Sequence, residues 1–327
     1  MTDERRETLV EVAWLHHEYG LTQEEIARRL DVSRSTVSRL LADAERAGIV
    51  RVVLTEPMRG ESRLAADLAM RLGMTAAVGG RAGHEAPPIA AARAAARLIE
   101  RIADAGSATI AVSWGRTLAA TASMVHPRVT HGITVVDAVG HAGGEQMTPA
   151  VDVTRSLAAA LGATVVHLPS PAFVSPGASR DALLGSEPVR RAIEIARHAD
   201  ATFVSIGVAG QGSRLVDAGL VSTEAMHALL AAGARGEILG HWFDAAGREM
   251  QLPDGLALPV AVGLAPADLR VSRRVIGVAG GAEKADAVLA ALAGGIVREL
   301  VIDDSLAQAL LDAADPLLAR ASQRGTA

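Results

Sequence analysis

The stretch TQEEIARRLDVSRSTVSRLLADAERAGIV, residues 22–50, carries the strongest local signal in this 327-residue chain. Thr22 and Glu25 stand at the spacing of a capping box, which predicts the start of a short helix. The segment Asp31–Ser33 interrupts that helix, and its serine can cap a second one. Apolar residues at helical spacing would pack the two helices together: Ile26, Ala27 and Leu30 in the first, and Val37, Leu40 and Leu41 in the second.

The residues on the outward face of the second helix are arginines and residues with short hydroxyl side chains. Small hydroxyl side chains let a backbone approach DNA, and guanidinium groups bind phosphate or guanine. The pattern predicts a helix-turn-helix whose recognition helix covers about Arg34–Ala47. An amphipathic helical hairpin with a solvated polar face is the alternative, but it needs neither the three-residue break nor a face so poor in Glu and Lys. The candidate DNA-binding residues are Thr22, Gln23, Ser33, Arg34, Ser35, Thr36, Ser38 and Arg39.

Flanking segments complete the predicted module. A preceding helix is expected at about Arg5–Tyr19. It would supply the third side of the core through its apolar residues Leu9, Val10, Val12, Ala13 and Leu15. Gly48 can end the recognition helix, and the run Ile49–Leu54 predicts a strand, so the module would be winged. Arg51 on this wing would reach the DNA backbone or a groove.

Composition excludes several classes of protein. The chain is long enough for two domains, and its apolar fraction is 50 % with only 2 % aromatic residues, so the core must consist of Ala, Val, Leu and Ile. The absence of cysteine excludes disulfides and thiol catalysis. The charged N-terminus and the lack of an apolar run of about 20 residues predict a cytoplasmic protein with no membrane contact.

Net charge alone argues against a nucleic-acid partner, since the chain carries a charge of −5. Residues 1–55 hold eight Arg against ten acidic residues, which gives −2. The sign reverses within residues 28–46, where five Arg stand against three acidic residues. We therefore expect double-stranded operator DNA to bind through a small basic face, with affinity gained by presenting several copies of it.

Beyond the wing, short apolar runs alternate with helical stretches. This alternation is typical of a parallel sheet that is covered by helices on both faces. Strands are expected at residues 108–113, 133–136, 164–168, 201–207, 274–279 and 298–302. Helices are expected at residues 61–72, from residue 117 onward, and at residues 150–161, 188–198, 282–293 and 305–314.

Glycine-rich turns recur where these strands lead into helices, the place at which parallel sheets bind ligands. They are Ser113–Thr117, Gly140–Gly144, Ser205–Gly212 and Ala279–Lys284. The first turn combines Gly115, Arg116 and Thr117 as a phosphate-binding loop would, although a plain strand-to-helix turn has the same composition. In the second, His141 could bind a hydroxyl group or simply lie exposed.

Lys284 is the only lysine, against 31 arginines. The helix macrodipole disfavours a cation in the first turn of a helix unless an anion lies there, which favours a phosphate-binding role for Lys284. Motifs for catalysis are lacking: the sequence has no H-E-x-x-H, no G-x-S-x-G and no Walker A loop. We therefore predict no catalytic residue, no bound metal and no cofactor.

These motifs resemble the SorC family of sugar-binding transcriptional regulators, which is sometimes grouped with the bacterial deoxyribonucleoside regulator. The resemblance rests on the helix-turn-helix and on TIAVSWGRTLA, HLPSPAFV, ADATFVSIG, GARGEILGHWFD, VIGVAGGAEKADAVLAAL and LVIDDSLAQALL, in that order. It implies an α/β chain: a winged helix-turn-helix DNA-binding domain over residues 1–55, and a Rossmann-like parallel-sheet domain over residues 56–327. The second domain would resemble sugar-phosphate isomerases and deaminases, and it would bind the effector and form oligomers.

The resemblance also implies an effector site. The effector would be a phosphorylated sugar or sugar alcohol, bound by Gly115, Arg116, Thr117, Gly140, His141, Arg214, Glu237, Gly281 and Lys284. Asp244 would hold local structure. Family members form dimers and tetramers, so a homo-oligomer is expected.

The resulting hypothesis is a transcriptional regulator of carbohydrate or sugar-alcohol catabolism, controlled by a phosphorylated sugar. One alternative is a sugar-phosphate isomerase or deaminase with an attached DNA-binding module, for which Glu237 is the candidate base. Another is a DNA-binding protein whose α/β domain serves only in assembly.

Overall fold

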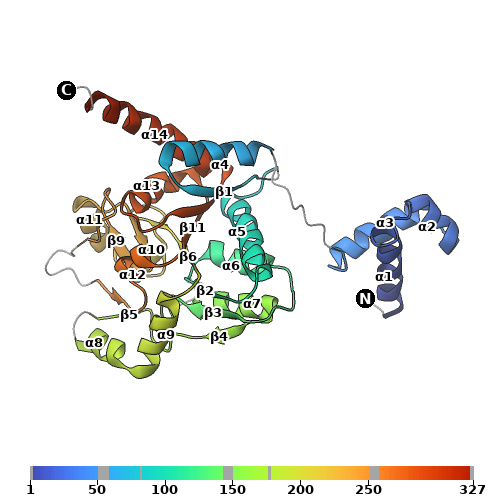
Figure 1. Ribbon diagram of the computed structural model, residues 1–327, viewed down its shortest axis with the longest axis horizontal. Coiled ribbons are helices and arrows are strands. Elements are labelled where there is room, and N and C mark those ends of the chain that lie inside the picture. Colours follow the sequence, from blue (N-terminus) through green and yellow to red (C-terminus); the bar gives the residue numbers. More distant parts are fainter. Residues whose placement is uncertain are drawn as a thin grey trace. The chain divides into compact units, whose positions relative to one another are not determined.

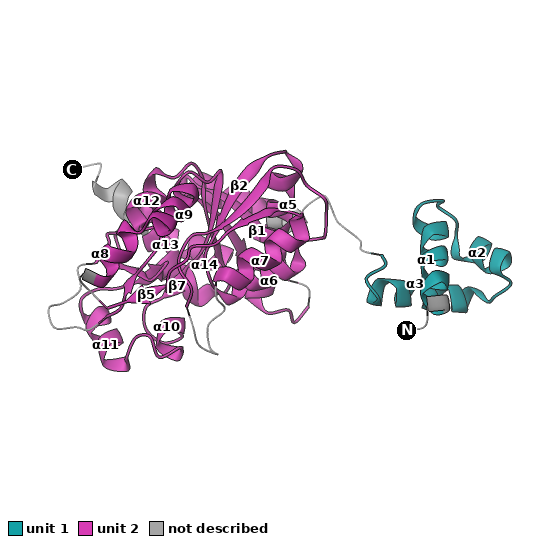
Figure 2. Cartoon of the chain, turned by 90° about the horizontal axis from the view of Figure 1, so that it is seen from below, with its two compact units in different colours: residues 1–57 teal, residues 58–327 magenta. Residues whose placement is uncertain are grey.

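The computed structural model describes residues 3–50, 59–81, 83–142, 150–175, 178–250 and 258–324. The chain divides into two compact units, residues 1–57 and residues 58–327 (Figure 2). Among the described residues, no helix combines the length and apolar character that a membrane span requires.

The first unit is a bundle of three short helices. They are α1 (Asp3–His17), α2 (Gln23–Leu30) and α3 (Arg34–Arg46). The predicted capping box is present, because the Glu25 amide donates to the Thr22 hydroxyl at 3.3 Å and the Thr22 amide donates to the Glu25 carboxylate at 2.8 Å. Asp31 ends α2 in the left-handed region at φ 52°, and Ser33 then caps α3.

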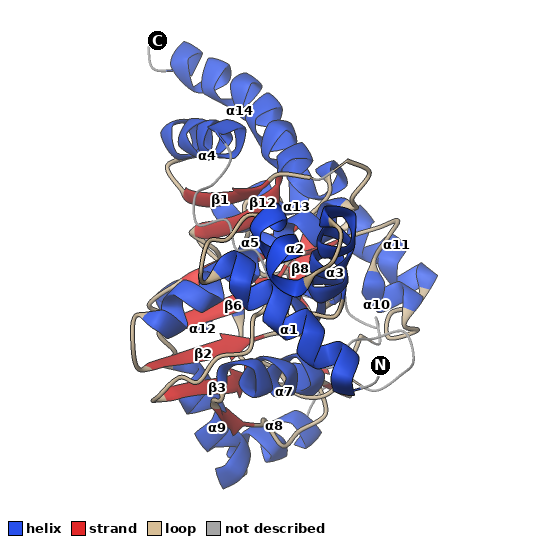
Figure 3. Ribbon diagram, turned by 90° about the vertical axis from the view of Figure 1, so that its right-hand side faces the viewer, coloured by secondary structure: helices blue, strands red, loops and turns tan. Residues whose placement is uncertain are grey.

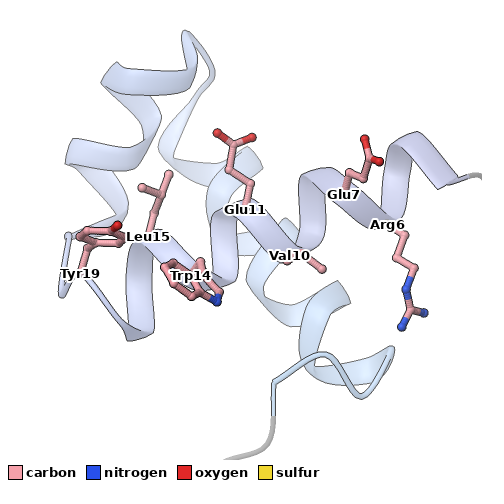
Figure 4. Close-up of a pocket in the computed structure, with 7 residues that line it drawn as sticks. All are labelled: Arg6, Glu7, Val10, Glu11, Trp14, Leu15 and Tyr19. Carbon is pink, nitrogen blue, oxygen red and sulfur yellow. The ribbon is translucent and has the colours of Figure 1, made fainter.

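The small core forms between one face of α1 and the inward faces of α2 and α3. Its buried residues are Leu9, Val12, Ala13, Leu15, Ile26, Ala27, Val37, Leu41 and Ala44. The prediction for Val10 is wrong: its side chain is 40 % exposed, because it lies on the side of α1 that faces away from this core, where it lines a groove with Trp14 and Tyr19 (Figure 4). Helix α1 also ends before Tyr19. Of the predicted wing, residues 51–54 lie outside the described part, and residues 49 and 50 are not in a strand.

The second unit is built on a parallel sheet of seven strands in the order β1-β12-β11-β6-β2-β3-β4 (Figure 1). Figure 3 shows β1, β12, β6, β2 and β3 following one another along this sheet. The strands are β1 (Thr75–Gly79), β2 (Ala108–Val112), β3 (Ile133–Asp137), β4 (Thr164–Val166), β6 (Ala201–Ser205), β11 (Val275–Ala279) and β12 (Glu299–Asp303). The predicted parallel sheet is confirmed.

Both faces of the sheet are covered, because successive side chains of each strand enter opposite cores. Val135, for example, packs into one apolar cluster and Val136 into the other. The first cluster includes α5 (Pro87–Asp104), α6 (Arg116–Met124) and α7 (Ala150–Leu161). The second includes α4 (Arg59–Leu72), α9 (Glu187–Arg197), α12 (Pro266–Val271), α13 (Ala285–Ala293) and α14 (Asp304–Arg324).

Smaller elements lie outside the main sheet. One antiparallel sheet joins β7 (Gly207–Val208), β8 (Gly236–Ile238) and β9 (His241–Phe243), and another joins β5 (Phe173–Val174) to β10 (Val260–Ala261). The remaining helices are α8 (Ala178–Gly185), α10 (Arg214–Asp217) and α11 (Thr223–Ala231).

The helix pattern differs from the sequence prediction in several places, because α5, α8, α10, α11 and α12 were not predicted. The longest of these is α5, which is buried along most of its length. The helix expected at residues 282–293 begins as a short 3-10 turn, η1 (Ala282–Lys284), and continues as α13. Lys284 therefore lies at the N-cap of α13 and not in its first turn.

Candidate functional site

The predicted glycine-rich turns follow four strands that are neighbours in the sheet. Strands β11, β6, β2 and β3 lie side by side in that order, and all of them are parallel. Their carboxyl ends therefore lie at one edge. The chain runs from β2 to β3 and β4 in one direction, and from β6 to β11 and β12 in the other, so β2 and β6 flank a topological switch point. Open α/β sheets bind ligands at such points.

Gly115 lies at this switch point, where the turn after β2 meets the end of β6. Its φ is +126°, and a Cβ atom there would come within 2.6 Å of the Ser205 hydroxyl oxygen. The Ser205 amide in turn donates to the Ser113 hydroxyl at 3.1 Å. Glycine is thus required on two grounds, backbone conformation and close approach. The Ser205 hydroxyl is buried and has no hydrogen-bond partner among the described residues.

Helix α6 begins directly after Gly115, and no side chain caps its N-terminus. Arg116 is exposed and Thr117 is buried in this first turn. Free amides at a helix N-terminus, next to a guanidinium group, form a suitable environment for an anion.

Lys284 reaches the same edge from the turn after β11. Its ammonium donates to the Ile206 carbonyl at 2.9 Å, just beyond the end of β6. Burial lowers the pKa of the Lys284 ammonium; the nearby carboxylate of Glu237 acts in the opposite direction, and the positive charge of Arg116 adds to the lowering. A bound anion would compensate for this burial of charge.

Glu237 comes from the separate antiparallel sheet. Its carboxylate accepts a hydrogen bond from the Gly240 amide at 2.9 Å and packs against Gly207, where a Cβ atom would collide with it. Burial raises the pKa of Glu237, against the lowering effects of the Gly240 amide and of Lys284. The structure therefore brings both Arg116 and Glu237 within electrostatic reach of Lys284.

Gly281 is held by a residue that the sequence prediction did not include. The Gly281 amide donates to the buried Asp303 carboxylate at 2.8 Å, and the Ser305 amide donates to the same side chain at 3.0 Å. Gly281 itself adopts φ +107°. Asp303 thus fixes the turn that carries Lys284.

Gly140 and His141 form the turn after β3, and His141 lies near further polar groups. A Cβ atom at Gly140 would come within 2.5 Å of two backbone carbonyls, so only glycine fits. The His141 ring lies 6.1 Å from the ring of His167, whose Nδ1 atom is 3.0 Å from the buried Asp137 carboxylate. Among the described residues, the buried Nδ1 atom of His141 has no hydrogen-bond partner.

The exposed residues of α3 form the candidate DNA-binding surface. Arg34, Ser35, Ser38 and Arg39 are exposed and Thr36 is half-buried, whereas Val37 beneath them is fully buried. Thr22 and Ser33, by contrast, are engaged in helix capping.

Comparison with known proteins gives the family. A family model described as "Putative sugar-binding domain" matches residues 56–312, and a MarR family model matches residues 12–59. The full-length sorbitol operon regulator SorC from Klebsiella pneumoniae superposes with a TM-score of 0.69 at 25 % identity, over 95 % of this chain and 100 % of that chain. The chain belongs to the SorC family of sugar-binding transcriptional regulators.

Other relatives are similar to this chain over nearly their whole length, which supports this membership. The erythritol catabolism regulatory protein EryD of Brucella abortus is 28 % identical over 95 % of this chain and 98 % of its own. The deoxyribonucleoside regulator of Bacillus subtilis is 27 % identical over 95 % of this chain and 99 % of its own. This SorC-family protein is thus a DNA-binding, sugar-responsive transcriptional regulator.

Some residues at this edge of the SorC-family structure were not predicted as site residues, and three of them share a sequence signal. Asp137, Ser205 and Asp303 each end an apolar strand at the carboxyl edge. A polar residue that closes an apolar run could have identified all three. His167 lies just beyond β4 and gives no comparable local signal.

Two other expectations have different outcomes. Asp244 holds local structure, as the resemblance implied, because its carboxylate accepts from the amides of Ala246 and Arg248. Arg214 begins the short helix α10 and forms an ion pair with Asp217 at 2.7 Å. Its contact with an effector stays a prediction. In the described part of the chain, no group of acidic, His or Cys side chains could hold a metal ion.

Proposed function

We propose that this regulator controls carbohydrate or sugar-alcohol catabolism, and that its effector is a phosphorylated sugar or sugar alcohol bound at the switch-point edge. The observation that carries the proposal is that Lys284 lies within electrostatic reach of both Glu237 and Arg116, the first residue of α6. A phosphate group carries the negative charge that two cations and free helix amides bind well. The proposal is in keeping with EryD and SorC, whose names refer to erythritol catabolism and the sorbitol operon.

The far end of the effector would be a polyol. Glu237 can accept a hydrogen bond from a hydroxyl group, and the buried Ser205 hydroxyl and His141 ring each have an atom without a partner among the described residues. Buried polar atoms are normally hydrogen-bonded. Hydroxyl groups of a sugar would supply those partners.

A thermal-unfolding screen tests this assignment. The full-length protein is heated alone, with a panel of sugar and polyol phosphates, with the same compounds lacking phosphate, and with inorganic phosphate. A true effector at about 100 times its Kd adds about 2.7 kcal/mol to the stability of the unit that binds it. We expect stabilisation by one or more of the phosphorylated compounds only. Equal stabilisation by a compound and its phosphate-free counterpart would refute a phosphate site.

We also infer that the edge senses its ligand without converting it. Glu237 is the residue that an isomerase or deaminase would use as a base, and burial raises its pKa. Its carboxylate, however, is already engaged by the Gly240 amide and packed against Gly207. Incubation of the protein with the stabilising compound, followed by product analysis, should show the compound unchanged; turnover would establish an enzyme.

Operator binding is proposed to need more than one copy of the chain. Residues 1–55 carry a net charge of −2, and the basic face is confined to a small part of them. Helix-turn-helix proteins commonly bind two half-sites through paired recognition helices. A dimer or tetramer would raise the effective concentration of the second recognition helix.

A further inference from the structure

Asp137, His141 and His167 form a polar cluster at the carboxyl ends of β3 and β4. Asp137 closes β3 and is fully buried. Its carboxylate accepts hydrogen bonds from the Thr154 hydroxyl and, at 3.0 Å, from the Leu168 amide. The same carboxylate lies 3.0 Å from the Nδ1 atom of His167. Asp137 is thus held by α7 on one side and by the chain beyond β4 on the other.

The contact with Asp137 fixes the tautomer of His167. A carboxylate only accepts hydrogen bonds, so the Nδ1 atom of His167 carries the proton that is donated to Asp137. In the neutral ring, the Nε2 atom then has a free lone pair. The two nitrogens lie on different sides of the imidazole ring, so Nε2 points away from the buried carboxylate. The side chain of His167 is 36 % exposed and that of Asp137 is 0 % exposed, as expected if Nε2 lies open at the edge of the sheet.

His141 places a second imidazole ring next to that of His167. The two ring centroids lie 6.1 Å apart, edge to face, and the buried Nδ1 atom of His141 has no hydrogen-bond partner in the described part of the chain. The His141 amide donates to the Ser170 carbonyl at 2.8 Å, and the His141 carbonyl accepts from the Ala172 amide at 2.7 Å. His141 is therefore locked onto the segment that follows His167. A ligand hydroxyl group would give its buried nitrogen the partner that such atoms normally have.

The strand order sets the distance between this cluster and Lys284. The Lys284 ammonium lies against the Ile206 carbonyl just beyond β6, and β4 is three strands away from β6 in the sheet (Figure 1). At about 4.8 Å per strand, the two ends of the site lie about 14 Å apart. A hydrogen bond of about 2.8 Å at each end leaves about 9 Å between the phosphate oxygen and the far hydroxyl oxygen of a ligand that reaches both.

This distance fits an open-chain ligand of about five carbons. At roughly 1.2 Å per extended single bond, the eight bonds from a phosphate oxygen to the far hydroxyl oxygen of a five-carbon chain span about 9 Å. The six bonds of a three-carbon chain span only about 7 Å and do not reach both ends. The ring form of a sugar folds the chain back on itself and is shorter than the open form.

We propose that His167, oriented by Asp137, determines the specificity of the effector site by accepting a hydrogen bond from the hydroxyl group farthest from the phosphate. This inference rests on the phosphate site of the proposed function and narrows its ligand to an open-chain sugar or sugar alcohol phosphate of about five carbons. His141 binds a neighbouring hydroxyl group. A site built to accept from a hydroxyl group discriminates against the analogue that lacks it, because the analogue leaves the acceptor unpaired.

Matched ligands test the role of His167 in the full-length protein. Glycerol phosphate and the phosphates of ribitol, arabitol and xylitol are titrated by calorimetry. The five-carbon compound that binds most tightly is then compared with its analogue that lacks the far hydroxyl group. In wild type the analogue should bind about five- to tenfold more weakly, as expected for the loss of one hydrogen bond. In His167→Phe, which keeps a flat ring of similar size, the compound and its analogue should bind equally.

Controls separate this proposal from the phosphate site on which it rests. His198→Phe, at an exposed position at the end of α9, should keep the wild-type preference. His167→Leu repeats the test with another apolar side chain, and circular dichroism confirms folding. Equal binding of the compound and its analogue to wild type, or an unchanged preference in the folded His167 variants, would overturn the proposal and leave the phosphate site intact. Tighter binding of glycerol phosphate than of every five-carbon compound would refute the assigned length. If none of the phosphorylated compounds binds, the phosphate site fails together with the proposal.

Discussion

Lys284 is the residue on which the proposed sugar site depends most. It carries the only lysine ammonium of the chain, places it against the Ile206 carbonyl and lies near both Glu237 and Arg116. The neighbouring glycines have a different role, because Gly115 and Gly281 adopt backbone conformations that side chains disfavour. In the proposed site, the charge of Lys284 binds the phosphate, and the glycines allow the effector to come close to the backbone.

We predict that Lys284→Ala raises the Kd for the stabilising sugar phosphate by about 10- to 100-fold, since a hydrogen bond to a charged group contributes roughly 1.5–3 kcal/mol. Operator binding in the absence of sugar should stay within twofold of wild type. Calorimetric titration and a gel-shift assay measure the two quantities. Arg190→Ala, on the exposed side of α9, is the control and should change neither. If Lys284→Ala binds the sugar phosphate as tightly as wild type, Lys284 does not belong to the site.

Glu237 gives a prediction about pH. Burial raises its pKa above the ordinary value of 4.5, so the folded state favours the protonated carboxyl. Its contribution to stability is therefore fully present below about pH 4.5 and is lost as the pH rises through the folded-state pKa. Glu237→Gln removes this dependence.

As the pH rises from 4.5, the unfolding temperature of wild type should therefore fall relative to that of Glu237→Gln. Asp286→Asn, at an exposed position of α13, serves as the charge-matched control. A difference that is constant across this range would show that Glu237 has the same pKa in both states.

At the scale of elements, α3 owes its position to local caps and a small apolar core. Ser33 accepts a hydrogen bond from the Thr36 amide at 3.1 Å, and Val37 and Leu41 anchor the inward face. The exposed arginines contribute nothing to that core. Their removal should thus affect DNA binding without affecting the fold.

We predict that Arg34→Ala and Arg39→Ala each weaken operator binding, and that each lowers the slope of log affinity against log salt by about 1 if the guanidinium binds phosphate. If it binds a guanine, discrimination at one base pair should fall instead by about 1–3 kcal/mol. Gel-shift titrations over a salt series distinguish the two roles. Arg63→Ala, exposed on α4, is the control, and wild-type retardation by both α3 variants would count against this helix.

At the scale of the whole molecule, regulation requires that sugar and DNA each affect the binding of the other. A ligand shifts a conformational equilibrium only through its different affinities for the two states. Couplings of about 1–3 kcal/mol, or 5- to 150-fold in affinity, are typical of such regulators.

We therefore predict a reciprocal effect. If the sugar phosphate changes operator affinity by a given factor, saturating operator DNA should change sugar-phosphate affinity by the same factor. Titration of each ligand in the presence and absence of the other measures both. Lys284→Ala supplies the uncoupled control. Tight binding of both ligands with no mutual effect would show that the sugar-binding domain does not regulate operator binding.

The sequence by itself determined the local structure. The capping box at Thr22, the break at Asp31–Ser33 and the apolar runs of the sheet were all predicted correctly, because caps and side-chain periodicity depend on neighbours within a few residues. The glycine-rich turns after β2, β3, β6 and β11 were identified for the same reason.

Only the tertiary structure decided which of these turns are neighbours. Strand order depends on pairing between distant segments, such as β2 with β6, and no local pattern encodes that pairing. The support of Gly281 by Asp303 is likewise a long-range contact. So is the exposure of Val10, which helical spacing had assigned to the core, because the side of α1 that becomes buried depends on where α2 and α3 pack.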